Sequence, residues 1–230
     1  MAKIKLQQAF SDIRGKLNGS VFSKNRTANY IRTKSTPINR NTTSQSAARA
    51  GFKTLTTGWR GLTQAQQLTW TNAVSNWLKT NSLADKIQLT GAQLYIRLNR
   101  VIQTIGGTLI TSAPVVSSLA EMTTNTVAPV GATPTIPITY TPAIPSTVSF
   151  MVFASAPQSA GKKFVKNQLR YIGVILLADT SPKDIHLMYE AKFGTGWRTL
   201  QGEWIWIKLV PAVTLTGQQG IGSTFGAVIA

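Results

Sequence analysis

The chain has 230 residues and a formal net charge of +17, with 24 Lys or Arg against 7 Asp or Glu. It has no cysteine, which excludes disulfide bonds and thiolate chemistry. No stretch approaches the roughly 18 consecutive apolar residues of a membrane span, so no membrane contact is expected.

The positive charge is concentrated near the N-terminus. Residues 1–60 hold 12 Lys or Arg and one acid, Asp12, whereas residues 113–230 hold 8 basic and 5 acidic residues. A strongly basic surface attracts polyanions or acidic protein neighbours. The asymmetry predicts one basic arm on a protein that is otherwise mildly charged.

The first predicted element is a basic β-hairpin within residues 1–42. Residues 20–24 (SVFSK) and 29–35 (NYIRTKS) contain the β-branched and aromatic residues that suit strands. Residues 25–28 (NRTA) suit a loop between them, since Asn tolerates turn conformations. Pro37 then favours an extended segment, because proline disfavours a helical residue before it.

Three helices are predicted in residues 43–112. The first spans about 44–60, and the second and third begin after Thr63 and Thr90, where a Gln three residues later completes a capping box. Apolar side chains recur at helical spacing along the first helix: Ala48, Phe52, Leu55, Trp59 and Leu62. Such a stripe predicts that the helix packs one face against its neighbours.

The remainder is predicted to be a linker followed by a β-rich domain. Residues 113–133 are rich in Pro, Ser, Thr and Ala and read as a linker. Residues 134–230 are predicted to form a β-sandwich of immunoglobulin or fibronectin type, with one short helix that begins at Ser181 and ends at Gly194. Strands are expected at about 136–140, 148–155, 170–178, 203–210 and 225–229. The expected fold class is α+β: a basic N-terminal β-hairpin arm and three-helix region, then a C-terminal immunoglobulin-like β-sandwich.

The aromatic residues are expected mainly in cores. Three tryptophans lie at helical core spacing: Trp59, Trp70 and Trp77. Trp204 and Trp206 alternate in a strand, so they point to one face, where a core or a subunit contact suits them better than nucleic acid. A second basic cluster at 160–170 is expected to cover a loop or a strand edge.

The sequence is poor in residues that could carry out catalysis. His186 is the single histidine, and the closest acidic pair, Asp179 and Asp184, is expected to serve as a turn residue and a helix cap. No motif for a catalytic nucleophile, a phosphate-binding loop or a metal site occurs. We therefore expect no enzyme activity, no metal and no cofactor.

Several segments resemble a family of proteins encoded by tailed phages and by prophages. The matching features are a Gly-Lys-x-x-Gly-x-Val-Phe hairpin at 15–22, a Tyr-x-Arg strand at 30–32, a Pro-x-Asn turn at 37–39, and the helical segments WRGLTQAQQLTW and GAQLYIRLNR. The resemblance covers roughly residues 13–107. It implies a virion component, with other virion proteins and further copies of the chain as partners. The β-rich tail resembles the immunoglobulin-like domains of phage structural proteins.

Two functions remain open from the sequence, and both use the basic arm. In the first, the arm docks a structural protein of the capsid, neck or tail onto its neighbours; in the alternative, it contacts nucleic-acid phosphates without sequence specificity. The charged contact residues are predicted to be Arg14, Lys16, Lys24, Arg26, Arg32, Lys34 and Arg40. The apolar docking residues are predicted to be Val21, Phe22, Tyr30 and Ile31. These four favour a protein surface, because phosphate contacts do not need apolar area.

Overall fold

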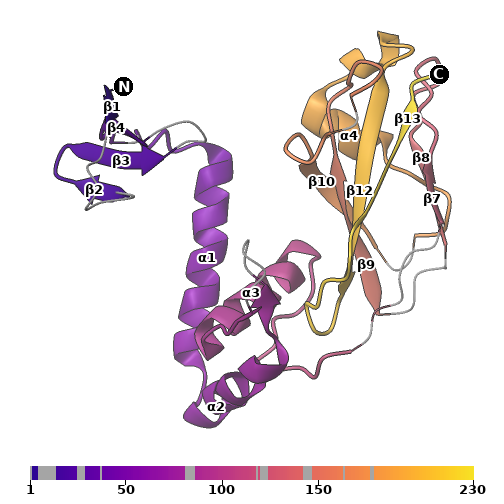
Figure 1. Cartoon of the computed structure of the whole chain (residues 1–230). Coiled ribbons are helices and arrows are strands. Elements are labelled where there is room, and N and C mark those ends of the chain that lie inside the picture. Colours follow the sequence, from indigo (N-terminus) through magenta and orange to yellow (C-terminus); the bar gives the residue numbers. More distant parts are fainter. Residues whose placement is uncertain are drawn as a thin grey trace. The chain divides into compact units, whose positions relative to one another are not determined.

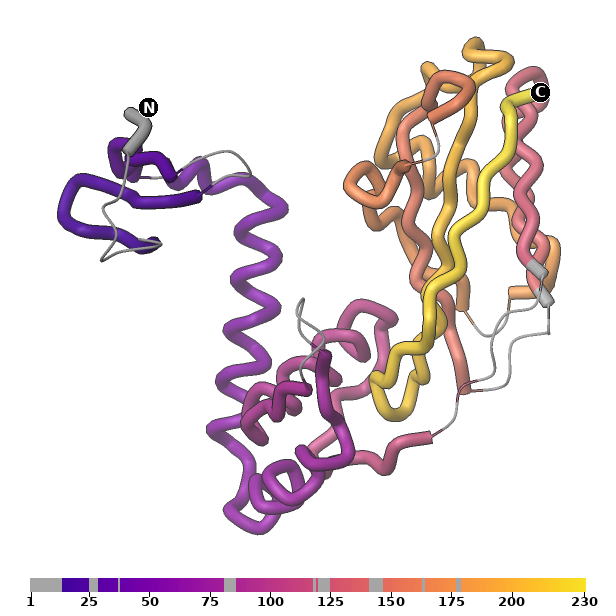
Figure 2. The backbone as a smooth tube through the Cα atoms, viewed as in Figure 1, coloured from indigo at the N-terminus to yellow at the C-terminus, as the bar shows by residue number. Residues whose placement is uncertain are grey.

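The structure is a computed structural model, and it describes residues 2–4, 14–24, 29–36, 38–80, 86–117, 119, 124–141, 147–162, 164–176 and 179–230. The chain divides into two compact units, Met1–Ser46 and Ala47–Ala230. Figure 1 labels most of the helices and strands of both units, and Figure 2 traces their backbone. The mixed α+β class expected from the sequence is confirmed.

The N-terminal unit contains a four-stranded antiparallel sheet in the order β1-β4-β3-β2. Its strands are β1 (Ala2–Ile4), β2 (Gly15–Leu17), β3 (Ser20–Lys24) and β4 (Asn29–Thr33). Asn18 turns the chain between β2 and β3 in the left-handed conformation, at φ 47°. The pairing of β3 with β4 confirms the two predicted strands, although the predicted loop between them lies outside the described residues. The hairpin is therefore the centre of a larger sheet.

The helical region begins the second unit and follows the predicted boundaries closely. Its elements are α1 (Thr43–Gly61), α2 (Gln64–Ala73), the short 3-10 helix η1 (Val74–Asn76), α3 (Gly91–Thr104) and the two-stranded β5 (Lys79–Thr80) and β6 (Lys86–Ile87). Both predicted capping boxes are present. At α2, for example, the Thr63 hydroxyl oxygen accepts from the Gln66 backbone N–H at 3.3 Å, and the Gln66 amide oxygen accepts from the Thr63 N–H at 2.9 Å.

The predicted tryptophan core is confirmed within these helices. Trp70 is fully buried and meets Tyr95 edge-on, with 5.3 Å between ring centroids. Trp77 is also buried, and the half-buried Trp59 packs against the same cluster. Burying large aromatic side chains removes much apolar area from water, so this cluster stabilises the helical region.

The apolar stripe predicted on α1 is only partly buried. Leu55 is fully buried, but Phe52 is 55% exposed. The contact of α1 with α3 runs through two glycines: a Cβ at Gly51 would overlap the Arg100 side chain, and a Cβ at Gly58 would lie 2.7 Å from the Tyr95 hydroxyl. Because α1 approaches α3 at these two glycines, the face of α1 that carries them turns inward. Phe52 lies outside this contact between α1 and α3.

The C-terminal part consists of two antiparallel sheets that share one core. Their orders are β10-β9-β12-β13 and β11-β8-β7. The elements are β7 (Thr124–Val127), β8 (Pro137–Thr141), β9 (Val148–Ala154), β10 (Arg170–Ile175), β11 (Lys183–Asp184), α4 (His186–Phe193), the 3-10 helix η2 (Gly196–Thr199), β12 (Trp204–Val213) and β13 (Ser223–Val228). Ile138 of β8, Val152 of β9 and Ile207 of β12 are fully buried in one cluster, so the inner faces of the two sheets pack together.

The short C-terminal helix does not begin where the sequence predicted. Ser181 precedes the two-residue strand β11, which pairs with β8, and α4 begins at His186. Asp184, predicted to cap a helix beginning at Ser181, instead accepts from the backbone N–H of Ile136 at 2.8 Å and of His186 at 3.0 Å. Pairing with β8 therefore overrides the local helix-start signal, while the predicted end at Gly194 is correct.

The predicted linker at 113–133 contains the strand β7. Val127 of this strand is buried in the shared core, and β7 pairs with β8 along its length. Further contacts join helices and sheets: Val101 of α3 and its C-cap residue Ile105 pack against Met151 and Ala212 of the outer face of the larger sheet. Both regions lie in one compact unit, residues 47–230.

A fragment that keeps β7 should be more stable than one that begins at the predicted boundary. We expect residues 124–230 to unfold cooperatively and to exceed residues 134–230 in free energy of unfolding by about 2 kcal/mol, because the shorter fragment loses a buried valine. Thermal unfolding followed by circular dichroism measures the difference. Equal melting temperatures would show that β7 contributes nothing to the core.

Candidate docking surface of the N-terminal sheet

The strand register of the N-terminal sheet divides its side chains between two faces. Val21 of β3 lies opposite Lys16 of β2 on one side and Arg32 of β4 on the other. Tyr30 lies two residues before Arg32 and opposite Ser23, so it shares this face. The first face therefore combines two apolar anchors with two cations.

The second face carries the other pair of predicted apolar residues. Phe22 and Ile31 lie directly opposite each other, a cross-strand pairing that brings side chains into contact. Lys24 follows Phe22 by two residues and belongs to the same face. Leu17, at the edge of this face, is 65% exposed. The four predicted docking residues thus form two pairs on opposite faces, not one continuous patch.

Neither face is closed by the part of the N-terminal unit that the structure describes. None of the described residues from 14 to 46 is buried, and the four apolar residues named above are half-buried. A sheet with apolar side chains ordinarily packs one face against another element. This sheet therefore offers apolar area that a partner could cover.

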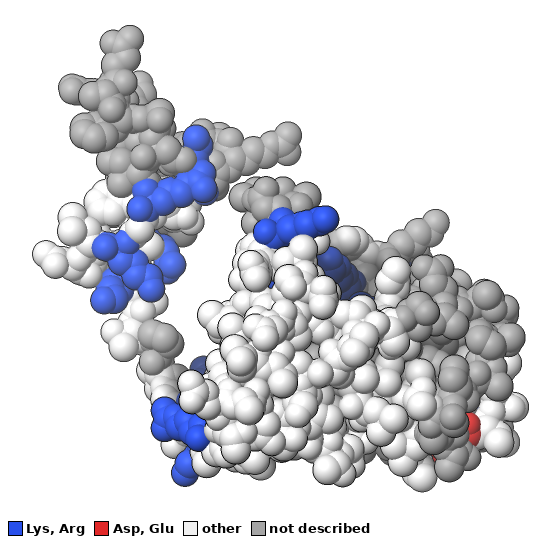
Figure 3. Space-filling view, turned by 90° about the horizontal axis from the view of Figure 1, so that it is seen from below, with Lys and Arg blue, Asp and Glu red and all other residues white. Residues whose placement is uncertain are grey.

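The cations predicted for this site are exposed where the structure describes them. They are Arg14, Lys16, Lys24, Arg32, Lys34 and Arg40, while Arg26 lies outside the described residues. Figure 3 shows how far basic side chains outnumber acidic ones on one face of the molecule. The sequence contains one acid, Asp12, before residue 85, so the field around this unit is strongly positive.

Helix α1 carries further cations, which were not among the site residues predicted from the sequence. Arg49, Lys53 and Arg60 are exposed and share one helical face, since they are four and seven residues apart. This face lies opposite the one that buries Leu55. The helix begins with a further reciprocal cap: Gln45 N–H donates to the Thr42 hydroxyl at 3.3 Å, and Thr42 N–H donates to the Gln45 amide oxygen at 3.2 Å. The helical spacing of these three cations in the sequence could have predicted this basic face.

The described acids lie far along the chain, and three of them, Asp179, Asp184 and Glu190, have partners of their own. Asp179 accepts from the ammonium of Lys183 at 2.6 Å, and Glu190 accepts two bonds from the Arg198 guanidinium at 2.7 Å each. These pairings lower the pKa of both carboxyl groups. These acids thus stabilise local structure in the C-terminal part. Asp179, predicted as a turn residue, accepts from the backbone N–H of Leu176 at 2.9 Å.

The lone histidine also belongs to a structural contact. His186 Nδ1 lies 2.6 Å from a carboxylate oxygen of Asp184, at the start of α4. In the described part of the chain, no group of three or more His, Cys, Asp or Glu could hold a metal, and no helix is long and apolar enough to cross a membrane.

The Asp184 contact predicts loss of stability in acid. Burial raises the pKa of Asp184, but its hydrogen bonds to Ile136, to His186 and to the imidazole outweigh burial and lower it below 3.8. A lowered folded-state pKa gives stability that is present above the ordinary pKa and is lost as pH falls through the folded one. We expect the melting temperature of the protein to decrease as the pH is lowered below about 4. In Asp184→Asn this decrease should be less steep, and thermal unfolding at a series of pH values measures both. An unchanged acid slope in the variant would contradict this assignment.

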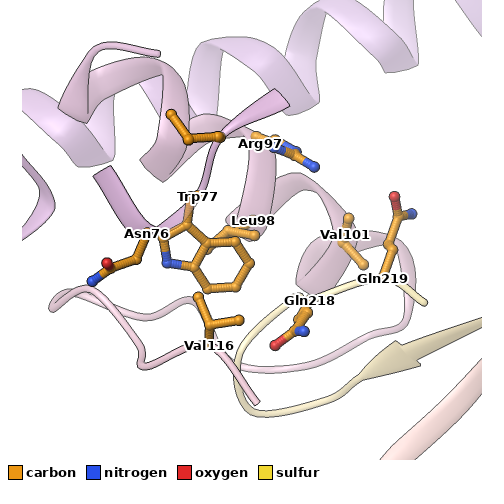
Figure 4. A pocket seen from close by; sticks show the side chains of 10 residues that line it. Asn76, Trp77, Arg97, Leu98, Val101, Val116, Gln218 and Gln219 are labelled. Atoms are coloured by element: carbon orange, nitrogen blue, oxygen red, sulfur yellow. The ribbon is translucent and has the colours of Figure 1, made fainter. Parts of the chain in front are cut away.

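A small pocket lies where α3 meets the β12–β13 connection (Figure 4). Its volume is about 220 Å³, and its lining includes Trp77, Arg97, Gln218 and Gln219. Gln218 is bonded at both ends of its amide: it donates to the Ser117 carbonyl at 2.6 Å and accepts from the Ser117 N–H at 2.9 Å. The indole N–H of Trp77 is buried without a partner among the described residues, so it does not open into the pocket. The pocket therefore lies where hydrogen bonds between Ser117 and Gln218 join the segment after α3 to the β12–β13 connection.

No family model, curated protein or solved structure matches the chain.

Proposed function

We propose that this protein is a structural component of a bacteriophage particle, in the capsid, neck or tail. The N-terminal sheet docks on an acidic surface of neighbouring virion proteins. Further copies of the chain are among the expected neighbours. The protein acts by binding and not as an enzyme.

One observation carries the proposal: the N-terminal sheet has apolar pairs and cations on both faces, and no residue among those described from 14 to 46 is buried. Interfaces combine an apolar centre with a polar rim. Opposite charge on the partner would steer association and would disfavour basic neighbours. The resemblance of residues 13–107 to a phage and prophage family implies that the neighbours are virion proteins.

The strand order of the C-terminal part supports an immunoglobulin-like assignment. Lettered along the chain, β7 and β8 are strands A and B, β9 and β10 are C and C′, and β11, β12 and β13 are E, F and G. The two sheets then read A-B-E and C′-C-F-G, which is the arrangement of an immunoglobulin-like sandwich without a strand D. Helix α4 lies in the connection between E and F.

An inventory of purified particles tests the proposed function. The protein is expected at a fixed number of copies per particle, and it should remain after the genome has been released. Quantitative mass spectrometry of intact and emptied particles measures both quantities. Absence from purified particles would contradict the proposal.

Phosphate binding by the same sheet is the second candidate, and the small number of acids in this part of the sequence, where Asp12 is the one acid before residue 85, favours it. Contact with duplex DNA would give a slope of about −0.9 in log K against log salt for each phosphate neutralised. If most of the predicted cations took part, the slope would be roughly −4 to −6. A shallower slope, together with persistence on emptied particles, supports docking on protein.

A further inference from the structure

The outer face of the larger C-terminal sheet is apolar and aromatic. The inner residues of β12 enter the shared core, so Trp204, Trp206, Lys208 and Val210 point outward. The outer face of an antiparallel sheet is commonly polar when it meets water. Here three of these four outward side chains are apolar or aromatic. The helical region covers part of this face: Val101 of α3 packs against Met151, and Phe153 and Val210 are partly buried against the same cluster.

Aromatic rings stand on three neighbouring strands of this face. Phe153 of β9 lies opposite Tyr171 of β10, with ring centroids 5.7 Å apart, and opposite Lys208 of β12 on its other side. Trp204 and Trp206 stack with 5.7 Å between centroids. Tyr171 is 39% exposed. The rings thus form a partly open platform across the strands, and Lys208 lies within it.

A groove of about 470 Å³ runs over the same face. Its apolar floor includes Met151, Phe153 and Val210, and two lysines line it, Lys166 and Lys208. Lys166 belongs to the second basic cluster, which the sequence predicts at a loop or a strand edge. The fold brings this cluster to the aromatic strands, although 42 positions separate the two lysines.

No acid among the described residues points out from this face. Asp179, Asp184 and Glu190 are engaged in the contacts described above. Glu203 precedes the outward Trp204 and acts on the buried Tyr189, whose pKa burial and this carboxylate both raise. The groove therefore presents positive charge beside aromatic rings.

We propose that this groove binds single-stranded nucleic acid. Phe153, which lines the groove, and the rings beside it on the same face would stack on unpaired bases. The ammonium groups of Lys166 and Lys208 would contact the backbone phosphates. Aromatic platforms combined with basic grooves bind single strands with little sequence preference, because every base has a flat face. Aromatic residues on neighbouring central strands of a sheet bind RNA in the same physical manner. Duplex DNA keeps its bases stacked inside, so it would gain nothing from the rings.

The site is tested on the full chain with a labelled 20-nucleotide oligo(dT) and a duplex of the same length. Lys166→Gln/Lys208→Gln removes the groove lysines, and Lys79→Gln/Lys86→Gln removes the same charge from the β5–β6 hairpin. Tyr171→Ala removes one exposed ring without changing charge. Fluorescence anisotropy gives each affinity, and crosslinking with 5-iodouracil oligonucleotides followed by mass spectrometry locates the contact.

We expect the groove double variant to bind oligo(dT) about tenfold more weakly than the matched control. Tyr171→Ala should lose about fivefold or more in oligo(dT) affinity, since one stacked base is lost, and should bind the duplex unchanged. Crosslinks should map to β9, β10 or β12. Equal affinities of the groove and control variants would overturn the proposal. So would crosslinks confined to the N-terminal sheet, or displacement of the oligonucleotide by polyglutamate at equal charge, which would indicate an acidic peptide as the ligand.

Discussion

Deleting residues 1–41 is expected to abolish incorporation of the protein into particles. The deletion removes the whole N-terminal sheet with its apolar pairs and cations, but it keeps Thr42, which caps α1. Loss of a docking surface should lower affinity for the particle by far more than tenfold, since each 1.4 kcal/mol lost is a factor of ten. Quantitative mass spectrometry of particles assembled with the truncated chain measures the effect.

Two paired variants identify the face that docks. Val21→Ser/Tyr30→Ser alters the first face, and Phe22→Ser/Ile31→Ser alters the second, with equal numbers of apolar residues lost and no change in charge. The variant of the docking face should lose incorporation, while the other should keep most of it. Circular dichroism of each variant must show that its fold is retained. Normal incorporation of the truncated chain would refute docking through this sheet.

Gly217→Ala is expected to cause the largest loss of stability from a single small substitution. Gly217 has φ +68° in the β12–β13 connection, and a Cβ there would overlap the carbonyl oxygen of Leu98 and lie 3.1 Å from Ile102 Cγ1. The left-handed conformation and the overlap with α3 together should cost about 3 kcal/mol. In a domain of this size, the melting temperature should fall by roughly 6–12 °C.

Gly161→Ala is the matched control for this substitution. Gly161 also has positive φ, at +90°, but nothing lies within 4 Å of its Cβ position. It should show the conformational cost alone, about 1 kcal/mol. If the two variants lowered the melting temperature equally, close packing between α3 and the connection would contribute nothing, and the single compact unit at 47–230 would be in doubt.

The elements with strong local signals could be predicted from the sequence. The capping boxes at Thr63 and Thr90 fixed two helix starts to the residue, because reciprocal side-chain bonds make the first turn a local property. The strands of the larger sheet were predictable from their β-branched and aromatic residues. By contrast, β7 reads TNTV, a short polar segment that becomes a strand only because β8 is available to pair with it.

The candidate site was predicted in composition but not in arrangement. The cations and the four apolar residues follow directly from the sequence, but their division between two faces depends on the β3–β4 register. The groove on the outer face of the larger C-terminal sheet could not be predicted, because Lys166 comes close to Phe153 and Lys208 only in the folded chain. Likewise, the exposure of Phe52 follows from where two glycines let α1 approach α3.

Association with emptied particles tests the central claim most directly. Purified protein is mixed at moderate salt with particles that lack both this protein and the genome, and the bound fraction is measured after sedimentation. Docking on an acidic protein surface predicts that the full chain binds these DNA-free particles and that the chain lacking residues 1–41 does not. Binding that occurs only when the genome is present would contradict the claim and would assign the N-terminal sheet to nucleic acid.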